Sequence, residues 1–563
     1  MSQTKECHQC NKQFFVDDND RAYYAKIDVP EPMNCPECRL KRRLMERNAR
    51  VLYYRKCDLT GKQIISQYHA EVPFPVYDQN DWLTDQWDAM SYGQDLDLNR
   101  SFFEQYKELN DKVPHFSTFV TPNTLENSDY TNCTGYLKNC YLIVESDRDE
   151  DCYYSNLIKS SKDVVDSSIV FDSELCYECI DCTNCYNLEF SQDCENCRNS
   201  SFLKSCQGCN DCIGCVNQTQ KKNMIFNEQY SPEDYAKKIA ELFSKKRSDI
   251  NKLRGEAEEF FKKQIYKYRT ATNVENCSGD HIFNSKNSHS CFDSRTLEDC
   301  KYCAKVSNIA KDCMDYNSWG DNAELVYQSS SCGDNINNVK FCTTCVSNIK
   351  NLEYSDQCTS CSDCFGCVGL KKKQYCILNK QYTEEEYKAL REKLIAKMKT
   401  DGEWGEFFPI DICPFGYNET IAMDYFPLSK EEATVAGYKW KDPDQKEYQP
   451  ATKELPDSIE QVDESIMNEM FACIECKRNY KVIAQELSFY KKQSLPIPEF
   501  CPTCRHLHRI AKRNRATLYD RECMCDQTDH SHQGKCNEKF ETTYSPDRPE
   551  KIYCESCYQN AFL

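Results

Sequence analysis

The sequence of 563 residues contains little glycine and proline, with 16 and 19 residues respectively. This composition excludes a collagen-like chain and a low-complexity chain. No run of about 18 apolar residues is present, so we expect no transmembrane helix and no membrane partner. The first residues, MSQTKECHQCNKQ, lack the apolar segment of a secretory signal, and we therefore expect a cytoplasmic protein.

Motifs of the common enzyme classes are also missing. The sequence has no GxGxxG after a predicted strand, no Walker loop, no GxSxG and no HExxH. Only nine histidines occur, and four of them cluster near the end of the chain, at His506, His508, His530 and His532. We expect a non-enzymatic protein with no catalytic residue and no small-molecule substrate.

Cysteine is the abundant residue, with 41 copies in a chain of formal charge −19. Four groups account for all but Cys413, and they lie in residues 7–57, 133–215, 277–376 and 473–557. In a reducing cytosol such thiols serve as metal ligands or as buried apolar groups and do not form disulfides. The cysteines therefore predict both metal sites and an unusual core.

The two ends of the chain carry the same cysteine pattern at a constant offset of 466 residues. Each end has two CxxC pairs separated by 24 residues, and each second pair contains a proline. Four thiolates in this spacing are typical of a closed, tetrahedral, structural zinc site. The expected ligands are Cys7, Cys10, Cys35 and Cys38 at one end and Cys473, Cys476, Cys501 and Cys504 at the other.

The segments CHQCNKQFFVDDNDRAYYAKIDVPEPMNCPECRLKRR and CIECKRNYKVIAQELSFYKKQSLPIPEFCPTCRHLHR resemble a bacterial family of zinc-binding, treble-clef-like domains. That family shows CxxC, an aromatic hairpin, and then C-P-x-C-R. The resemblance covers about 40 residues at each end. The whole chain resembles large multi-zinc proteins of bacterial candidate phyla, which implies a fold and no particular activity.

A basic stretch follows each second CxxC pair, at residues 39–56 and 505–522. One interpretation is a helix that binds the phosphate backbone of RNA or another nucleic acid. The alternative is a solvated helix that balances the acidic remainder of the chain. The candidate nucleic-acid-binding residues are Arg39, Lys41, Arg42, Arg43, Arg47, Arg50, Arg505, Arg509, Lys512, Arg513 and Arg515.

A smaller zinc finger is predicted at the end of the chain. Its expected ligands are His532, Cys536, Cys554 and Cys557, while Cys523, Cys525 and His530 compete for the fourth position. In the N-terminal copy, Asp78 and Asp81 replace the last two cysteines, and only Cys57 remains of the sulfur set. Carboxylates match zinc poorly in place of thiolates, so we expect that copy to bind metal weakly or not at all. The total prediction is about three zinc ions per chain.

The two central blocks repeat a charged or polar residue, then any residue, then cysteine, mostly every 12 residues in the first block. The blocks match each other at an offset of 152 residues. Short strands with a fixed period predict a β-solenoid, whose narrow interior suits the small thiol group. The runs CYECIDCTNC and CQGCNDCIGC leave open zinc or iron–sulfur binding, or disulfides, as alternatives.

The predicted fold is mainly β with helical linkers, in which two cysteine-rich β-solenoid blocks are flanked by treble-clef or zinc-ribbon-like modules. The divisions are 1–56 (zinc module and basic helix), 57–126 (degenerate second zinc motif and connector), 127–230 (first solenoid), 231–272 (helical linker), 273–382 (second solenoid), 383–470 (helix and loop-rich connector), 471–516 (zinc module and basic helix) and 517–563 (small zinc finger).

Three functions fit these features. The first is a zinc protein that binds RNA or ribonucleoprotein through its terminal basic helices. The second is a scaffold whose solenoid faces bind other proteins and whose zinc is purely structural. The third is a thiol redox or metal-storage protein, which would require a thiolate with a lowered pKa.

Overall fold

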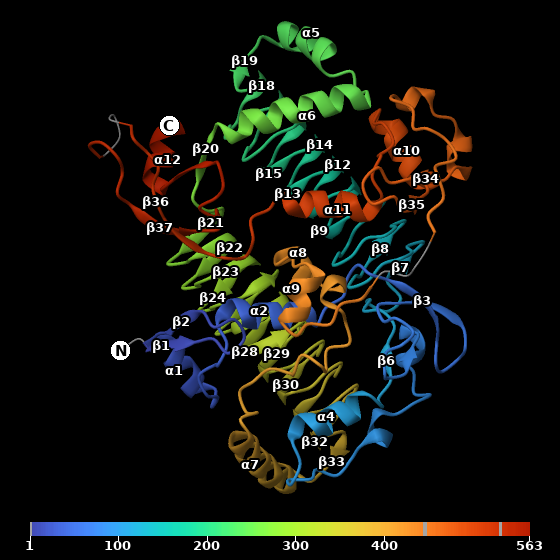
Figure 1. Cartoon of the computed structure of the whole chain (residues 1–563), viewed down its shortest axis with the longest axis vertical. Helices are drawn as coiled ribbons and strands as arrows, with labels where there is room; N and C mark the ends of the chain where they lie inside the picture. Colours follow the sequence, from blue (N-terminus) through green and yellow to red (C-terminus); the bar gives the residue numbers. More distant parts are fainter. Residues whose placement is uncertain (1–2, 443–446, 528–531, 563) are drawn as a thin grey trace.

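The computed structural model describes residues 3–442, 447–527 and 532–562. Two stacks of short parallel strands form the body of the molecule, and the two terminal modules lie against their sides (Figure 1). The chain is mostly strands with some helices, and cysteine tetrads lie at both ends, as the sequence predicted. No helix within the described ranges has the length and apolar character needed to cross a membrane.

The first stack extends from Leu125 to Gln229, and its later strands divide between a seven-stranded sheet and a four-stranded sheet. Apart from the antiparallel pair of β18 and β19, paired strands are parallel, and most partners lie 12 residues apart, as with Val170 and Cys182. From β9 to β16, successive strands alternate between the two sheets, so each 12-residue turn contributes to both, and the later strands add to the seven-stranded sheet. The strands are β7 (Leu125–Glu126), β8 (Leu137–Lys138), β9 (Asn156–Lys159), β10 (Lys162–Val165), β11 (Ser168–Phe171), β12 (Glu174–Tyr177), β13 (Ile180–Thr183), β14 (Tyr186–Glu189), β15 (Gln192–Glu195), β16 (Arg198–Ser201), β17 (Asn210–Ile213), β18 (Lys222–Ile225) and β19 (Glu228–Gln229).

The backbone of this stack repeats every three residues. From Asn127 to Phe226 nearly every third residue has a positive φ near 50°, as at Asn139 with φ 53° and Asp166 with φ 50°. Asparagine and aspartate tolerate this left-handed conformation better than most residues, which explains why they are frequent at these positions. Each turn therefore has four short sides, a period that the sequence analysis did not detect.

The residue after each left-handed position points into the stack and is buried. Cysteine, serine and aliphatic residues share these positions, for example Cys179, Ser167 and Val164. The thiol of Cys179 donates to the carbonyl oxygens of Tyr177 and Leu188, at 3.6 and 3.2 Å. The Ser167 hydroxyl likewise donates to the carbonyl of Val165, at 3.0 Å. The interior thiols thus act as small buried donors.

The variant Cys179→Ser is expected to remain well folded, because serine already makes the same hydrogen bond one turn earlier. We expect a loss of about 1 kcal/mol, whereas Cys179→Leu should cost about 1–3 kcal/mol through overpacking. Thermal unfolding of both variants provides the measurement. An equal loss in the two variants would contradict the proposed packing role.

The second stack differs from the first, which corrects the expectation of two like blocks. Its strands form one 13-stranded sheet, and several partners lie 13 residues apart, as with Met314 and Tyr327. The strands are β21 (Ala271–Glu275), β22 (Gly279–Lys286), β23 (Cys291–Arg295), β24 (Leu297–Glu298), β25 (Ala304–Val306), β26 (Ala310–Lys311), β27 (Met314–Trp319), β28 (Ala323–Ser330), β29 (Ile336–Lys340), β30 (Ile349–Glu353), β31 (Ser362–Phe365), β32 (Gln374–Ile377) and β33 (Lys380–Gln381).

Helices follow each stack. The predicted helical linker of residues 231–272 contains two helices, α5 (Pro232–Leu242) and α6 (Arg247–Lys262), of which α5 begins at the Ser231 N-cap. Helix α7 (Glu384–Asp401) begins at a capping box formed by Thr383 and Glu386. Later segments contain η2 (Tyr417–Glu419), α8 (Ile421–Tyr425), α9 (Lys430–Val435), η3 (Ile459–Gln461) and η4 (Glu464–Asn468).

The terminal modules pack on opposite stacks. In the N-terminal module, helix α2 (Pro36–Met45) lies against β27 and β28 of the second stack. In the C-terminal module, helix α11 (Pro502–Ala511) contacts the first stack through Asp166 and Tyr154. Figure 1 shows the blue α2 beside the lower stack and the red α11 across the upper one. Each end of the chain thus holds the half that is more distant in sequence.

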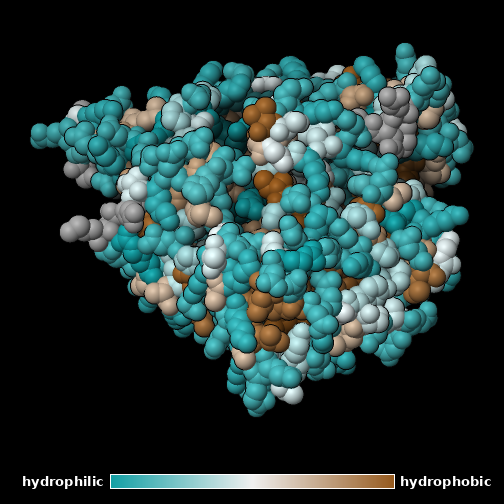
Figure 2. All heavy atoms as spheres, turned by 60° about the horizontal axis from the view of Figure 1, so that its bottom comes forward, coloured by the Kyte–Doolittle hydropathy of each residue, from teal (hydrophilic) through white to brown (hydrophobic). Residues whose placement is uncertain are grey.

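The other elements of the N-terminal third are β1 (Gln3–Glu6), β2 (Gln13–Val16), α1 (Asp18–Lys26), β3 (Tyr53–Lys56), β4 (Gln63–Ser66), β5 (Val76–Tyr77), α3 (Gln79–Trp82), η1 (Ala89–Tyr92), α4 (Phe102–Asn110) and β6 (His115–Phe116). Those of the linker and the C-terminal part are β20 (Ile265–Lys267), β34 (Phe471–Ala472), β35 (Asn479–Tyr480), α10 (Ala484–Gln493), β36 (Tyr519–Glu522), β37 (Lys539–Thr542), β38 (Lys551–Tyr553) and α12 (Glu555–Phe562). The face in Figure 2 is mainly hydrophilic, with a few separate hydrophobic patches.

Candidate metal centres

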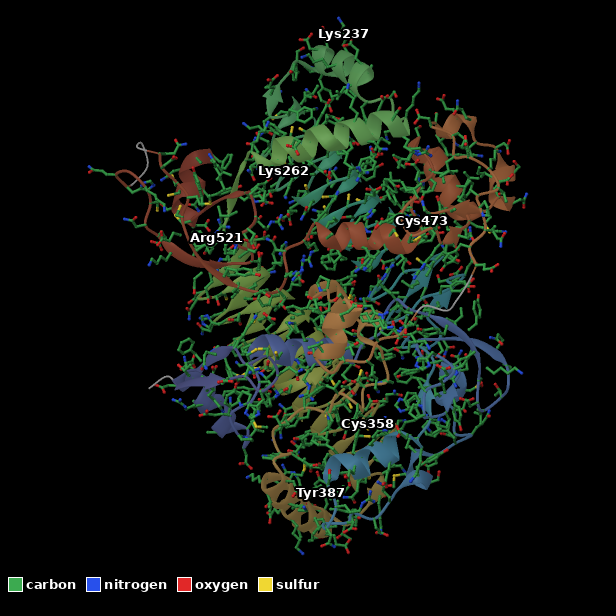
Figure 3. All side chains as sticks on the ribbon, in the orientation of Figure 1. Lys237, Lys262, Cys358, Tyr387, Cys473 and Arg521 are labelled. Carbon is green, nitrogen blue, oxygen red and sulfur yellow. The ribbon has the colours of Figure 1, made fainter. Side chains whose placement is uncertain are left out.

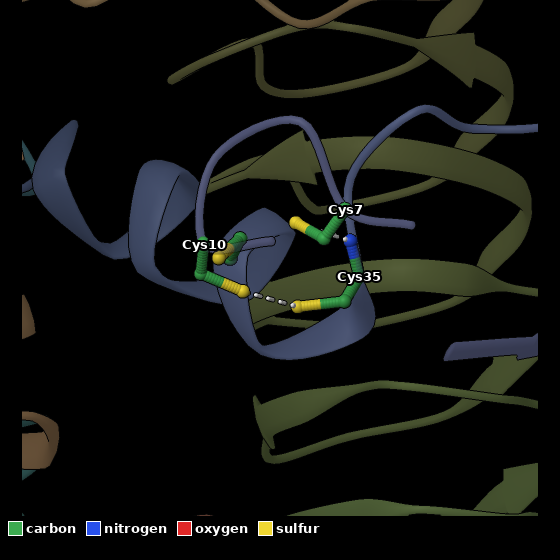
Figure 4. A group of neighbouring side chains, drawn as sticks. Cys7, Cys10 and Cys35 are labelled. Atoms are coloured by element: carbon green, nitrogen blue, oxygen red, sulfur yellow. Dashed lines mark hydrogen bonds between the residues drawn. The ribbon is translucent and has the colours of Figure 1, made fainter. Parts of the chain in front are cut away.

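The first tetrad is built from a hairpin and a helix start. Cys7 and Cys10 lie in the turn between β1 and β2, while Cys35 is the N-cap residue of α2 and Cys38 lies in its first turn. All four sulfur atoms lie within 4.8 Å of one another, and the sulfurs of Cys10 and Cys35 are 3.8 Å apart. A tetrahedral site with zinc–sulfur bonds of about 2.3 Å has sulfur–sulfur edges of about 3.8 Å. Figure 4 shows these sulfurs around one space.

The second tetrad repeats this construction at the other end. Cys473 and Cys476 lie between β34 and β35, Cys501 is the N-cap residue of α11, and Cys504 lies in its first turn. The sulfurs of Cys476 and Cys501 are 3.6 Å apart. In Figure 3 Cys473 lies beside α11. The structure thus brings together both predicted sets of four cysteines.

Local polar groups favour thiolate at these sites. The backbone N–H of Cys35 donates to the sulfur of Cys7 at 3.2 Å, and the sulfur of Cys35 lies at a helix N-terminus. The hydrogen bond from the Cys38 thiol is the main cause that lowers the pKa of Cys35 to about 5. Since thiolate is the form that binds metal, both features suit a cation at this position.

The third tetrad corrects the sequence prediction for the C-terminal finger. Its sulfurs belong to Cys523, Cys536, Cys554 and Cys557, so Cys523 takes the position that we had assigned to His532. The N–H of Cys554 donates to the sulfur of Cys523 at 3.2 Å, as in the first tetrad. His532 and Cys525 instead form a neighbouring group with Cys557. His530 lies outside the described residues.

The degenerate copy keeps the layout of this finger with a single sulfur, that of Cys57. The N–H of Asp78 donates to the sulfur of Cys57 at 3.3 Å, which matches the bond between Cys554 and Cys523. The Cys57 sulfur lies 3.9 Å from a carboxylate oxygen of Asp81. Weak metal binding at this copy stays a prediction.

The donor sets determine what the three tetrads can do. Each offers four thiols from buried or half-buried cysteines. Four sulfurs around one point fill the coordination shell of zinc, which gives a structural site with no open position. The residues therefore fit zinc, and the expected role is to hold each module in shape.

The stack cysteines do not form comparable groups. Within the described ranges, the only such cluster in the stacks consists of Asp181, Asp193 and His281, which come from both stacks. No sequence pattern could have joined residues so far apart. Burial lowers the pKa of His281, but Asp181, Asp280 and Asp193 outweigh it and raise that pKa to about 10.

This cluster predicts a pH dependence. The folded pKa of His281 lies above its ordinary value near 6.5, so protonation stabilises the folded state. That stability is fully present below about pH 6.5 and is lost as the pH rises through about 10. We expect the melting temperature of the wild type to fall across this range and that of His281→Gln to fall less. Identical slopes would contradict the prediction.

Four of the predicted nucleic-acid-binding arginines are buried against acidic side chains of the stacks, namely Arg39, Arg43, Arg505 and Arg509. Arg39 and Arg43 contact the carboxylate of Asp315, at 2.8 and 3.0 Å, in the second stack. Arg505 and Arg509 contact the carboxylate of Asp166 in the first stack. We call these the N-terminal arginine cluster (Arg39, Arg43, Asp315) and the C-terminal arginine cluster (Arg505, Arg509, Asp166). All six side chains are buried.

The two clusters are equivalent in detail. Besides its aspartate, Arg43 donates to the Asn317 side chain at 3.0 Å and to the carbonyl of Tyr302 at 3.5 Å. Arg509 donates to Ser168 at 3.3 Å and to the carbonyl of Tyr154 at 3.0 Å. The duplication thus includes the contact between module and stack.

Arg47 and Arg513 lie just beyond the ends of α2 and α11 and bridge the two stacks. Arg47 contacts Glu145 in the first stack, at 3.2 Å, and donates to Ser331 in the second, at 2.8 Å. Arg513 contacts Asp181 in the first stack, at 2.7 Å, and Asp293 in the second. These residues hold the halves of the body together.

The other predicted basic residues have varied surroundings. Lys41 pairs with Glu37 at 2.7 Å, and Arg42 donates to the carbonyls of Phe407 and Phe408. Arg50 is half-buried. Of the candidates named from the sequence, only Lys512 and Arg515 are exposed. The ammonium group of Lys512 lies 3.7 Å from a carboxylate oxygen of Glu258.

Comparison with known proteins identified no relative of this chain. No protein-family model matches the chain, and no curated protein matches it.

Proposed function

We propose that this protein is a non-enzymatic scaffold in which zinc ions shape the terminal modules and the strand stacks present binding faces to other proteins. The observation that carries this proposal is the pair of arginine clusters, because the basic helices are used internally. A helix whose guanidinium groups are buried against carboxylates cannot offer them to phosphate.

The architecture supports the scaffold role. The 12-residue parallel register, in which strands add along one direction, supports assigning the stacks to the β-solenoid type. A hairpin CxxC followed by a CxxC at a helix start supports a treble-clef-like assignment for the terminal modules. A β-solenoid presents an extended surface. In a treble-clef-like module the metal is structural.

A capture experiment tests the proposal. Purified tagged protein, loaded with zinc, is incubated with a cell extract with and without nuclease. We expect captured proteins to survive nuclease treatment and to be lost after zinc removal. Capture abolished by nuclease would contradict the scaffold role and favour the nucleic-acid role.

Nucleic-acid binding remains the second candidate, carried by the exposed Lys512 and Arg515. The formal charge of −19 opposes it. Filter binding of RNA across a salt series is expected to give little affinity and a shallow salt slope. A steep slope that Lys512→Ala and Arg515→Ala reduce would restore this function.

A further inference from the structure

Beside the third tetrad lies a second set of donor atoms. Cys525, His532 and Cys557 place a thiol, an imidazole nitrogen and another thiol within 4.8 Å of one another. Cys557 also belongs to the tetrad with Cys523, Cys536 and Cys554. One sulfur is therefore shared between two groups of potential ligands.

The orientation of His532 is set by a backbone contact. Its Nδ1 lies 2.8 Å from the carbonyl oxygen of Gly534, and a carbonyl only accepts, so Nδ1 carries the hydrogen. Its Nε2 lies 3.2 Å from the sulfur of Cys557. Histidines that bind metal commonly donate their other ring N–H to a backbone carbonyl in this manner.

A cation would stabilise the contact between the Nε2 of His532 and the sulfur of Cys557. In a zinc-loaded tetrad Cys557 is a thiolate without a proton, and the Nε2 of a neutral imidazole also presents a lone pair. Two lone pairs at 3.2 Å repel each other unless positive charge lies near both. A metal ion bound by both atoms supplies that charge.

We propose that Cys557 is a bridging thiolate and that Cys525, His532 and Cys557 hold a second zinc ion next to the ion of the tetrad. This inference rests on the proposed zinc occupancy of the tetrad. A zinc ion with four thiolates has a net charge of −2. When a second Zn²⁺ binds, the Cys525 thiol loses one proton to solvent, and the net charge of the site becomes −1. This smaller charge favours binding of both zinc ions, because Cys525 and Cys557 are buried and buried charge is costly.

Among the described residues, the second ion would have three protein donors, Cys525, His532 and Cys557. Sites with three protein ligands usually hold water in the fourth position. His532 is only half-buried, so solvent reaches this side. We therefore expect the second ion to exchange faster than the ion of the tetrad. The N-terminal copy has Leu59 at the offset of Cys525, so the pair belongs to the C-terminal finger alone.

Metal content of the full chain tests the proposal. Zinc-saturated wild type is expected to hold about four ions per chain after removal of excess metal, and Cys525→Ser and His532→Ala are each expected to hold about three. Cys277→Ser, which changes a cysteine outside every ligand group, is the matched control and should retain four. In cadmium-113-loaded wild type, two signals should show mutual scalar coupling through the shared sulfur, and Cys525→Ser should remove the coupling.

The outcomes are distinct. The second site would be overturned if the wild type and both variants each held about three ions and no cadmium signals were coupled. In that case the tetrads would still bind zinc, and the positive charge beside Cys557 would be a proton on His532. Two ions or fewer would overturn both the second site and the zinc occupancy of the finger. Circular dichroism of each variant verifies that lost metal does not reflect an unfolded chain.

Discussion

Asp166→Asn should destabilise the protein by about 3–5 kcal/mol, because it leaves two buried guanidinium groups without their carboxylate. Arg505 and Arg509 both contact Asp166, and neither the aspartate nor the arginines are exposed. The loss should appear as a lower urea midpoint and as faster hydrogen exchange in residues 502–511. Asp315→Asn should have a similar effect on α2, since the N-terminal arginine cluster has the same arrangement.

A matched control separates this effect from loss of an ordinary ion pair. Asp442 pairs with Lys430 at 2.7 Å, but both side chains are exposed, so Asp442→Asn should cause no measurable change. Replacing the whole C-terminal arginine cluster with Arg505→Met, Arg509→Met and Asp166→Leu should recover much of the lost stability. Equal midpoints for Asp166→Asn and Asp442→Asn would show that the buried charges do not hold the module.

Removal of zinc should have the second large effect. Structural zinc contributes about 10–16 kcal/mol to the folding of small zinc modules. A strong chelator is therefore expected to unfold the terminal modules and to release α2 and α11 from the stacks. The measurement is the reaction of thiols with a chromogenic disulfide reagent before and after chelation.

The expected time course has two phases. The twelve cysteines of the three tetrads should react rapidly after chelation. The buried stack cysteines, which donate to backbone carbonyls, should react only as the stacks unfold, whereas the half-buried Cys133 and Cys277 can react earlier. Zinc added before the thiol reagent should abolish the rapid reaction of the twelve tetrad cysteines. A rapid phase of that size already present in zinc-loaded protein would show that the tetrads do not bind metal.

The sequence predicted the two terminal tetrads correctly because CxxC spacing constrains local geometry strongly. It predicted the wrong fourth ligand for the finger, since His532 is closer to Cys536 in sequence than Cys523 is. The pairing of β36 with β37 brings the sulfurs of Cys523 and Cys536 within 4.8 Å of each other, although the backbone N–H of Cys536 donates to Cys525, and this proximity depends on strand register.

The burial of the basic helices was missed although a signal was present. Arg39 and Arg43 lie four residues apart and thus occupy one face of α2, as Arg505 and Arg509 do on α11. A charged helix face usually indicates contact with solvent. Here the carboxylates of Asp315 and Asp166 in the stacks contact these faces instead. The three-residue period was missed because cysteine is only one of several residue types at the inward positions.

The opposite docking of the terminal modules has a consequence for biosynthesis. Asp166 leaves the ribosome 339 residues before Arg505 and 343 residues before Arg509, the two residues that neutralise it. Domains usually fold in the order in which they emerge. A nascent chain of this protein must therefore keep the carboxylate of Asp166 hydrated until α11 has been synthesised.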